Sequence, residues 1–144
     1  EAGMGRDVGD PDRAAWLDWI HFAETISVHV AALTQQHIVL FEDSMRSPVI
    51  MKLEAKRLSR TIRSVEEALK GRDYLLPTGF SAADVGVGQA IYMGLHFVTL
   101  DDCPNVAAWY ARITARSAFQ KALPKKGEAT LYKEAFYPPW SAAT

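Results

Sequence analysis

A long uninterrupted helical segment near the N-terminus constrains the fold of this chain most. Between Arg13 and about Leu40 the sequence contains no glycine or proline, and Asp10-Pro11 supplies a start signal, so one long helix is predicted. Its apolar residues occupy most of the helix circumference: Trp16, Leu17, Trp19, Ile20, Phe22, Ala23, Ile26, Val28, Val30 and Leu33. A helix that is apolar on most sides must be buried on most sides. A chain of 144 residues does not easily supply that much burial.

A second helix is predicted between Ser47 and Gly71. Ser47-Pro48 is a start signal, because serine caps a helix and proline suits its first position. Lys70-Gly71 is a stop signal, since glycine suits the left-handed position that follows a helix. Apolar residues alternate steps of four and three and form a packing seam: Met51, Ala55, Leu58, Ile62, Val65 and Leu69. The basic residues lie mostly off this seam and are interpreted as a solvated face: Lys52, Lys56, Arg57, Arg60 and Arg63.

The sequence GFSAADVGVG, residues 79–88, predicts the start of a third helix over residues 82–98. Ser81 can accept from the backbone N–H of Asp84, and the Asp84 carboxylate can accept from the N–H of Ser81. This reciprocal capping box satisfies two donors that the helix itself leaves unpaired. Phe80 and Val85 occupy the two positions of a hydrophobic staple. These four residues are therefore interpreted as structural.

Two shorter helices are predicted before the C-terminal tail. Pro104-Asn105 begins the first, whose apolar residues share one face: Val106, Trp109, Tyr110 and Ile113. Ser117 can cap the second, which ends at Pro124. The tail contains many large apolar side chains, which predicts that it packs back on the body: Leu131, Tyr132, Phe136, Tyr137 and Trp140. No segment alternates with a period of two, so the fold class is predicted to be all-α.

Charge and composition argue against several classes of partner. The chain has 16 Lys and Arg against 17 Asp and Glu, so it lacks the one-sided basic surface that nucleic acids or anionic membranes require. No segment approaches about 18 consecutive apolar residues, so no membrane span is expected. The single cysteine, Cys103, excludes an internal disulfide and suits a reducing cytoplasm.

The chain by itself contains no complete catalytic apparatus. His21 and Glu24 have the spacing of a carboxylate–histidine metal pair, but the other predicted helices supply only His96 and no matching pair. No metal site is therefore expected. Cys103 precedes a proline and has no histidine or second cysteine nearby in sequence, which argues against a thiol nucleophile. The G-x-S-x-G motif of many serine hydrolases is also absent from the sequence.

Three segments together resemble a known family. RAAWLDWIHFAETIS, GFSAADVGVGQAIY and PNVAAWYARITARSAFQKAL are similar to the C-terminal domain of bacterial cytosolic glutathione S-transferases. In the capping segment, Gly79, Phe80, Ser81 and Asp84 match the family position by position. Residues 104–119 match a second specific pattern, P-N-V-x-x-W-Y-x-R-I-x-x-R-x-A-F.

This resemblance implies a bundle of five to six helices over residues 11–144, of the glutathione S-transferase (GST) C-terminal type, with residues 1–10 as an interdomain linker. It also implies an N-terminal thioredoxin-like domain, absent from this chain, that holds most of the glutathione site and activates the thiol. A homodimer, glutathione as co-substrate and a small hydrophobic electrophile follow from the same resemblance. The missing domain and the dimer partner would cover the apolar sides of the first helix.

The resemblance further suggests where a substrate cleft would lie. In the bacterial beta class, an Asn two residues after the Trp of the first helix reaches the glutathione of the partner subunit, and counting from Trp19 this position is His21. A His and a Lys of that class fall on Val28 and His29, so one of the two is apolar here. Glu24 and Thr25 lie near the same side of the helix. The candidate cleft residues are therefore His21, Glu24, Thr25, Val28 and His29.

The mechanism implied by the family is attack of the glutathione thiolate on an electrophile, with the helical domain binding the apolar acceptor. Tyr132, Phe136 and Trp140 could close such a cleft, although packing on the body is the favoured interpretation. The chain alone is expected to be inactive, because the thiol-activating residue lies outside it. An alternative is a non-catalytic adaptor module of the same fold, which would present a protein-binding patch instead of an open cleft. A third interpretation keeps the fold with other glutathione chemistry, such as isomerisation, dehalogenation or peroxide reduction.

Overall fold

The computed structural model describes residues 3–125, 127–128 and 130–139. Over these residues it contains five α-helices and no strand, which confirms the predicted all-α class. The helices are α1 (Arg13–Thr34), α2 (Pro48–Ala68), α3 (Ala82–Gly94), α4 (Pro104–Thr114) and α5 (Ser117–Ala122). A π-helical turn, η1 (Gln35–Val39), continues α1, and a short 3-10 turn, η2 (Asp43–Met45), precedes α2.

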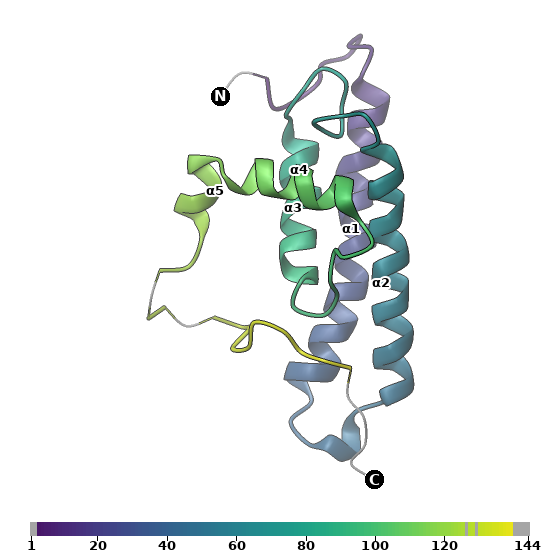
Figure 1. The fold of residues 1–144 in the computed structure, drawn as a ribbon, viewed down its shortest axis with the longest axis vertical. Coiled ribbons are helices and arrows are strands. Elements are labelled where there is room, and N and C mark those ends of the chain that lie inside the picture. The colour runs from purple at the N-terminus through teal and green to yellow at the C-terminus, as the bar shows by residue number, and fades with distance from the viewer. Residues whose placement is uncertain (1–2, 126, 129, 140–144) are drawn as a thin grey trace.

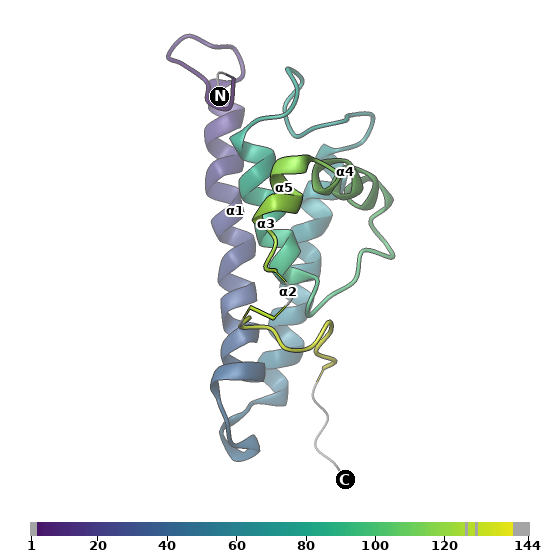
Figure 2. The ribbon, with the colours of Figure 1, turned by 90° about the vertical axis from the view of Figure 1, so that its left-hand side faces the viewer.

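Three of the helices run along the length of the molecule, and one crosses them. Figure 1 shows α1, α2 and α3 aligned with the long axis, with α4 lying across them. Figure 2 confirms this arrangement, because α4 is seen nearly end-on after the view is turned by 90°. Helix α1 packs against both α2 and α3, and α4 also contacts both α2 and α3. This arrangement encloses one core.

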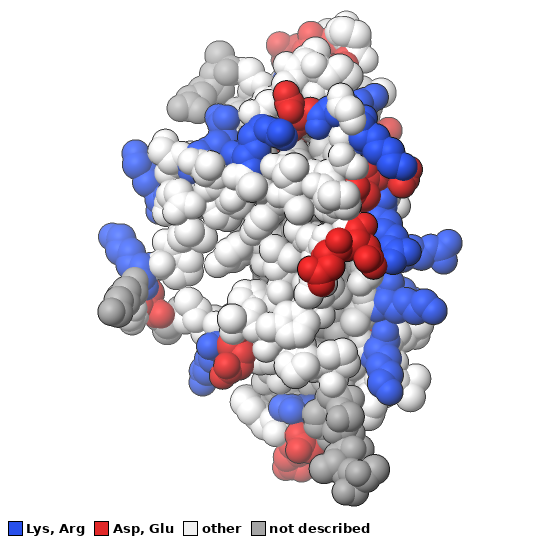
Figure 3. Space-filling model, in the orientation of Figure 1, with Lys and Arg blue, Asp and Glu red and all other residues white. Residues whose placement is uncertain are grey.

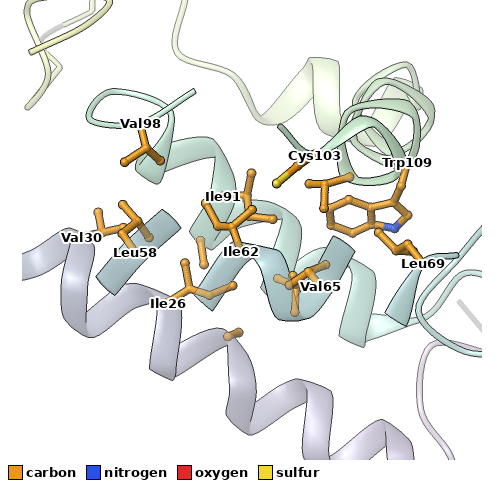
Figure 4. Packing of buried hydrophobic residues seen from close by; sticks show 14 of the residues in the cluster. Ile26, Val30, Leu58, Ile62, Val65, Leu69, Ile91, Val98, Cys103 and Trp109 are labelled. Carbon is orange, nitrogen blue, oxygen red and sulfur yellow. The ribbon is translucent and has the colours of Figure 1, made fainter. Parts of the chain in front are cut away.

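The core is formed where these four helices meet (Figure 4). The predicted seam of α2 supplies much of it, since Met51, Leu58, Ile62, Val65 and Leu69 are fully buried and Ala55 is partly buried. The other helices contribute the buried side chains Ile26, Val30, Leu33, Val87, Ile91, Val106 and Trp109. Burying a large apolar side chain stabilises the fold by about 1.5–3 kcal/mol. The alternation of four and three in the sequence therefore marks the surface of α2 that holds the bundle together.

The opposite surface of α2 is charged. Its five predicted solvated residues, Lys52, Lys56, Arg57, Arg60 and Arg63, are all exposed. Figure 3 shows Lys and Arg side chains along this edge of the molecule. The prediction of a solvated basic face is confirmed.

The capping box at the start of α3 is present. The Ser81 side chain caps the helix, and Asp84 Oδ2 accepts from the backbone N–H of Ser81 at 2.9 Å. The other carboxylate oxygen, Oδ1, accepts from the backbone N–H of Leu75 at 3.0 Å and from Trp109 Nε1 at 2.8 Å. Asp84 therefore joins the loop before α3, the start of α3 and helix α4.

Helix α4 receives its cap from another helix. Its N-cap residue, Cys103, makes no side-chain capping bond. Instead the buried carboxylate of Glu66, on α2, accepts from the backbone N–H groups of Asn105 at 3.2 Å and Val106 at 2.8 Å. These are N–H groups that a helix cannot satisfy internally. Glu66 thereby ties the start of α4 to α2.

Some predicted helix ends differ from the structure. Helix α1 begins at Arg13 with Asp12 at the N-cap, two residues later than Asp10-Pro11 would place it. The cause is local, because the Asp10 side chain accepts from the N–H of Asp7 at 2.7 Å and closes a turn before the helix. Helix α3 ends at Gly94 instead of residue 98, since the N–H groups of Phe97 and Val98 both turn back to the Gly94 carbonyl.

Two further ends differ by one or two residues. Helix α2 ends at Ala68, and Gly71 adopts a left-handed φ of +68° two residues after the C-cap Leu69. Ser117 is the first residue of α5, and Arg116 occupies the N-cap position that was assigned to Ser117. Hydrogen bonding at helix ends depends on neighbouring turns, so such shifts are expected.

The segment before α1, predicted to be a linker, lies against the bundle. The Met4 carbonyl accepts from Trp16 Nε1 at 3.2 Å and from the backbone N–H of Ala82 at 3.0 Å. Arg6 donates to the Thr78 hydroxyl at 2.7 Å. These bonds link the start of α1 to the start of α3.

The C-terminal tail, residues 130–139, packs on the body through two of its aromatic side chains. Tyr132 and Tyr137 are partly buried against the core, as predicted. Leu131 and Phe136 of the same tail remain more exposed, at 55% and 41%. Trp140 lies outside the described residues.

Candidate functional site

The structure places four of the five predicted cleft residues on the solvent side of α1. His21, Glu24, Thr25 and Val28 are all exposed, and Val28 is 61% exposed. Their spacing of three and four residues puts them on one face, opposite the buried face that carries Ile26. Among the described residues, none of the four lines the cavities found in the bundle. Their contact with glutathione stays a prediction.

The fifth residue, His29, is turned toward α2. Its Nδ1 lies 2.7 Å from Glu54 Oε2, and Arg57 donates to the other oxygen of Glu54 at 2.6 Å. Glu54 is buried, and an unpaired carboxylate there would destabilise the fold. The contacts with His29 and Arg57 pair this charge and link α1 to α2. His29 is therefore a helix-pairing residue in this structure, and its role toward a ligand also stays a prediction.

An apolar groove lies between α1 and α3 and is closed on one side by the tail. It has a volume of about 350 Å³. Its apolar walls include Val30 and Ala31 from α1, Ala90 and Met93 from α3, and Leu131 from the tail. A concave, mostly apolar hollow of this size suits a small organic ligand.

Three hydroxyl side chains line the groove: Ser27 and Thr34 were not predicted, whereas Tyr132 was named as a residue that could close a cleft. Ser27 and Thr34 lie on α1, and Tyr132 lies on the tail. Ser27 Oγ donates to the carbonyl of Ala23 at 2.9 Å, and Thr34 Oγ1 donates to the carbonyl of Val30 at 2.8 Å. The Tyr132 hydroxyl lies 2.9 Å from Thr34 Oγ1. The aromatic content of the tail was the one signal in the sequence that pointed to Tyr132.

The end of α3 holds the tail, and with it Tyr132, in place. The His96 ring stacks on Tyr132 with ring centroids 4.2 Å apart, and His96 Nδ1 lies 3.0 Å from the Glu134 carbonyl. The backbone N–H of Tyr137 donates to the His96 carbonyl at 2.7 Å. The Tyr137 hydroxyl in turn accepts from the backbone N–H groups of Lys133 and Glu134. Tyr132 is thus positioned by a folded turn and not by a loose chain end.

Burial strengthens the hold of the Tyr132 phenol on its proton. Desolvation raises the pKa of its phenol above 10.0, and this outweighs the hydrogen bond with Thr34, which lowers the pKa. The nearby Tyr137 raises the pKa further. Tyr132 is therefore neutral and retains its proton at physiological pH.

A second apolar cavity, of about 230 Å³, lies between α3, α4 and α5. Phe80 and Val85, the two residues of the predicted staple, both line it. The Arg116 guanidinium lies 3.7 Å from the centroid of the Phe80 ring and forms a cation–π contact. This cavity is next to the capping box. Unlike the groove, it is lined by a positively charged side chain, Arg116.

Other chemistry has little support among the described residues. No group of three or more His, Cys, Asp and Glu side chains in this part of the chain is placed to hold a metal ion. Burial raises the pKa of the Cys103 thiol, and the charge of Glu66 raises it further, so the thiol is a poor nucleophile. Within the same residues, no helix is both long enough and apolar enough to cross a membrane.

Comparison with known sequences agrees with the helical pattern. Residues 48–112 match the family model for the glutathione S-transferase C-terminal domain. The chain is also similar to protein LigF of a Sphingobium species, with 32% identity over 88 residues. This alignment covers 56% of the chain and 34% of LigF.

Three solved glutathione transferases have a similar fold. A glutathione transferase from Phanerochaete chrysosporium, solved with oxidized glutathione, has a TM-score of 0.72 at 18% identity and is aligned over 83% of this chain and 55% of its own. A glutathione S-transferase from Methylobacillus flagellatus, solved with bound GSH, has a TM-score of 0.71 at 20% identity, over 85% and 60% of the two chains. A glutathione transferase from Burkholderia graminis has a TM-score of 0.70 at 20% identity, over 86% and 54%.

The chain spans only part of each of these proteins, about a third of LigF and 54–60% of the three solved structures. At 18–20% identity the structural matches establish the fold. Residues 48–112 thus match the glutathione S-transferase C-terminal domain family, and the helical fold of the chain is shared with solved glutathione transferases.

Proposed function

We propose that this chain is the acceptor-binding domain of a glutathione S-transferase-like enzyme that conjugates glutathione to small apolar electrophiles. The observation that carries the proposal is the apolar groove of about 350 Å³ between α1 and α3, on a fold shared with glutathione transferases. In this proposal the groove holds the electrophile while a thioredoxin-like domain, joined before residue 11, binds glutathione and activates its thiol. The enzyme would act in the cytoplasm as a homodimer.

There is a chemical reason for binding the electrophile and activating glutathione on two different domains. Conjugation needs a thiolate next to an electrophilic carbon, and holding the two together removes much of the entropic barrier. The groove supplies the apolar surface for the electrophile. The described residues provide no group suited to deprotonate a thiol beside it, because the three hydroxyls are neutral and Cys103 lies elsewhere. The 144-residue chain is therefore expected to show no conjugation by itself.

The test compares the chain with the native polypeptide from its source cells, whose intact mass is measured first. A mass greater than 16.0 kDa by a small domain, about 80 residues, is expected. Conjugation of glutathione to chlorodinitrobenzene should then appear in the native polypeptide and not in the isolated chain. Saturable conjugation by the pure 144-residue chain would contradict the proposed division.

A groove-filling variant tests where the electrophile binds. Ala31→Trp places a large ring in the groove and should raise the KM for the electrophile at least several-fold while leaving the KM for glutathione nearly unchanged. Ala14→Trp is the matched control, because Ala14 is also exposed on α1 but does not line the groove. Equal effects of the two variants would show that the groove is not the acceptor site.

A non-catalytic adaptor is the second candidate, and one observation favours it. Large apolar side chains are exposed at the end of the bundle where α1 leads into α2, including Phe41 at 89% and Val49 at 74%. Exposed apolar patches often mark protein-binding surfaces. If the native polypeptide has the 16.0 kDa of this chain, no thiol-activating domain exists and the adaptor function should be preferred.

A further inference from the structure

The hydroxyl groups of the groove have a defined hydrogen-bond direction. A threonine hydroxyl has a single proton, and that of Thr34 is used in the bond to the Val30 carbonyl. The Val30 carbonyl can only accept, so with the Thr34 proton placed in that bond, Tyr132 is the donor in the 2.9 Å contact between Thr34 Oγ1 and the Tyr132 hydroxyl. The chain of bonds therefore runs from Tyr132 to Thr34 to the backbone of α1.

This direction determines what Tyr132 can offer to a ligand. Tyr132 lines the groove, and with its one proton directed at Thr34 its oxygen has only lone pairs left for a ligand. Among the described residues, Thr34 is the one hydrogen-bond partner of the Tyr132 hydroxyl, and no protein donor occupies those lone pairs. The phenol is protonated at neutral pH even at its ordinary pKa of 10.0, and burial raises the pKa further.

A second hydroxyl in the groove also donates its proton to the backbone of α1. Ser27 lies two turns before Thr34 on α1 and also lines the groove. Its proton is likewise used within the helix, in the 2.9 Å bond to the Ala23 carbonyl. Both side-chain hydroxyls of α1 in the groove thus direct their protons into the protein, and neither can donate to a ligand without breaking that bond.

We infer that the groove selects apolar ligands that carry a hydrogen-bond donor, such as a phenolic hydroxyl or an N–H group, and that Tyr132 is the residue that accepts from it. Thr34 is a positioning residue, because it acts by holding the Tyr132 proton. This inference rests on the proposed function, since it takes the groove as the acceptor-binding site. It adds the chemical class of the acceptor and the residue that recognises it.

The experiment measures probe binding to the native polypeptide by calorimetry, without glutathione. The probes are β-naphthol, which has a donor, and its methyl ether, which has the same ring system and can only accept. Tyr132→Phe removes the oxygen and keeps the ring that stacks on His96. It should lower the ratio of naphthol affinity to ether affinity about fivefold, by weakening the naphthol.

Thr34→Val gives a second, independent result. This substitution removes the Thr34 oxygen that accepts the Tyr132 proton, so Tyr132 can then donate to a ligand in the groove. The same affinity ratio should fall, but this time because the ether binds more tightly. Tyr92→Phe is the matched control, since Tyr92 lies on α3 outside the groove, and it should leave the ratio unchanged.

A purely structural role for the two hydroxyls would change the affinity of both probes equally. An unchanged ratio in Tyr132→Phe would therefore overturn the inference, and so would a failure of either probe to bind the native polypeptide. Conjugation of chlorodinitrobenzene is measured separately on the same samples. Conjugation without a Tyr132-dependent ratio would refute the inference alone, whereas a Tyr132-dependent ratio without conjugation would refute the proposed function alone.

Discussion

At the scale of single residues, Asp84 connects more of the structure than any other side chain of α3. It is fully buried, and its two oxygens accept from the backbone of Leu75 and Ser81 and from the indole of Trp109. A carboxylate can do this because both of its oxygens accept. An amide has one accepting oxygen and one NH₂ group, so it cannot replace the full set.

Asp84→Asn is expected to destabilise the fold by about 2 kcal/mol or more, because at least one buried donor loses its acceptor. Ser81→Ala removes the cap alone and should cost about 1 kcal/mol. Urea unfolding of both variants measures the difference. Asp18→Asn, at an exposed position on α1, is the control and should lie within about 0.5 kcal/mol of the unmodified chain. If Asp84→Asn were as stable as the Asp18→Asn control, the buried bonds of the Asp84 carboxylate would contribute nothing measurable.

At the scale of elements, the glycines of α3 determine how closely its neighbours approach. A Cβ built on Gly88 would lie 2.5 Å from Ile113 Cδ1 of α4, whereas one on Gly86 would lie 3.5 Å from Ala23 Cβ of α1. The first position has no room unless Ile113 moves, and the second allows ordinary contact. Gly88 is therefore needed for close packing of α4 on α3. Gly86 is not, and it only lowers the helix propensity of α3.

Gly86→Ala is expected to stabilise the fold by about 0.5–1 kcal/mol, since alanine favours a helix and the added methyl makes only ordinary contact with Ala23. Gly88→Ala carries the same propensity gain but must displace the buried Ile113 side chain, an overpacking cost of about 1–3 kcal/mol. It should therefore be the less stable of the two variants in thermal or urea unfolding. Equal stabilisation by both would mean that α4 is free to shift away from α3.

At the scale of the whole molecule, α2 is linked to its neighbours on both sides by buried carboxylates. Glu54 contacts His29 of α1, and Glu66 caps α4. Burial alone would raise the pKa of each, but for Glu54 the bonds from His29 and Arg57 outweigh it and lower the pKa below 4.5. For Glu66 the N–H donors of α4 outweigh burial in the same way.

Acid should therefore weaken the molecule as a whole. A carboxyl whose pKa is lower in the folded state adds stability above its unfolded pKa, near 4.5, and loses it as the pH falls through the folded value. The free energy of unfolding should fall as the pH is lowered below about 4.5, and Glu66→Gln should make this decrease shallower. Glu67→Gln, an exposed neighbour, should leave the slope nearly unchanged. A Glu66→Gln slope equal to that of the unmodified chain would show that Glu66 does not contribute to it.

The structure confirms the sequence predictions best where they rest on residues close together in the chain. The Ser47-Pro48 start, the seam of α2 and the capping box of α3 were predicted from spacing and are all present. Each of these depends on residues within one helix turn or on one face of one helix. The shifted starts of α1 and α5 show the limit, since Asp10 was assigned to a cap and instead closes a turn with Asp7.

The site was predicted less well, for a physical reason. Four of the cleft residues that the family resemblance suggested lie on an exposed face of α1. Whether this face contacts a ligand depends on which domain or subunit packs beside it. The groove instead joins Ser27 and Thr34 of α1 to Ala90 of α3 and Tyr132 of the tail. Thr34 and Tyr132 are 98 residues apart in sequence, and no local pattern relates them.

Local propensity, apolar periodicity and capping were thus sufficient to determine the helices, the all-α class and the buried side of α2. The tertiary structure decided how Asp84 and Glu66 connect different helices, which glycines are tightly packed and where the groove lies. The reason is that helix formation depends on neighbours three or four residues away, whereas a cavity and its hydrogen-bond direction depend on which faces the packed helices leave uncovered.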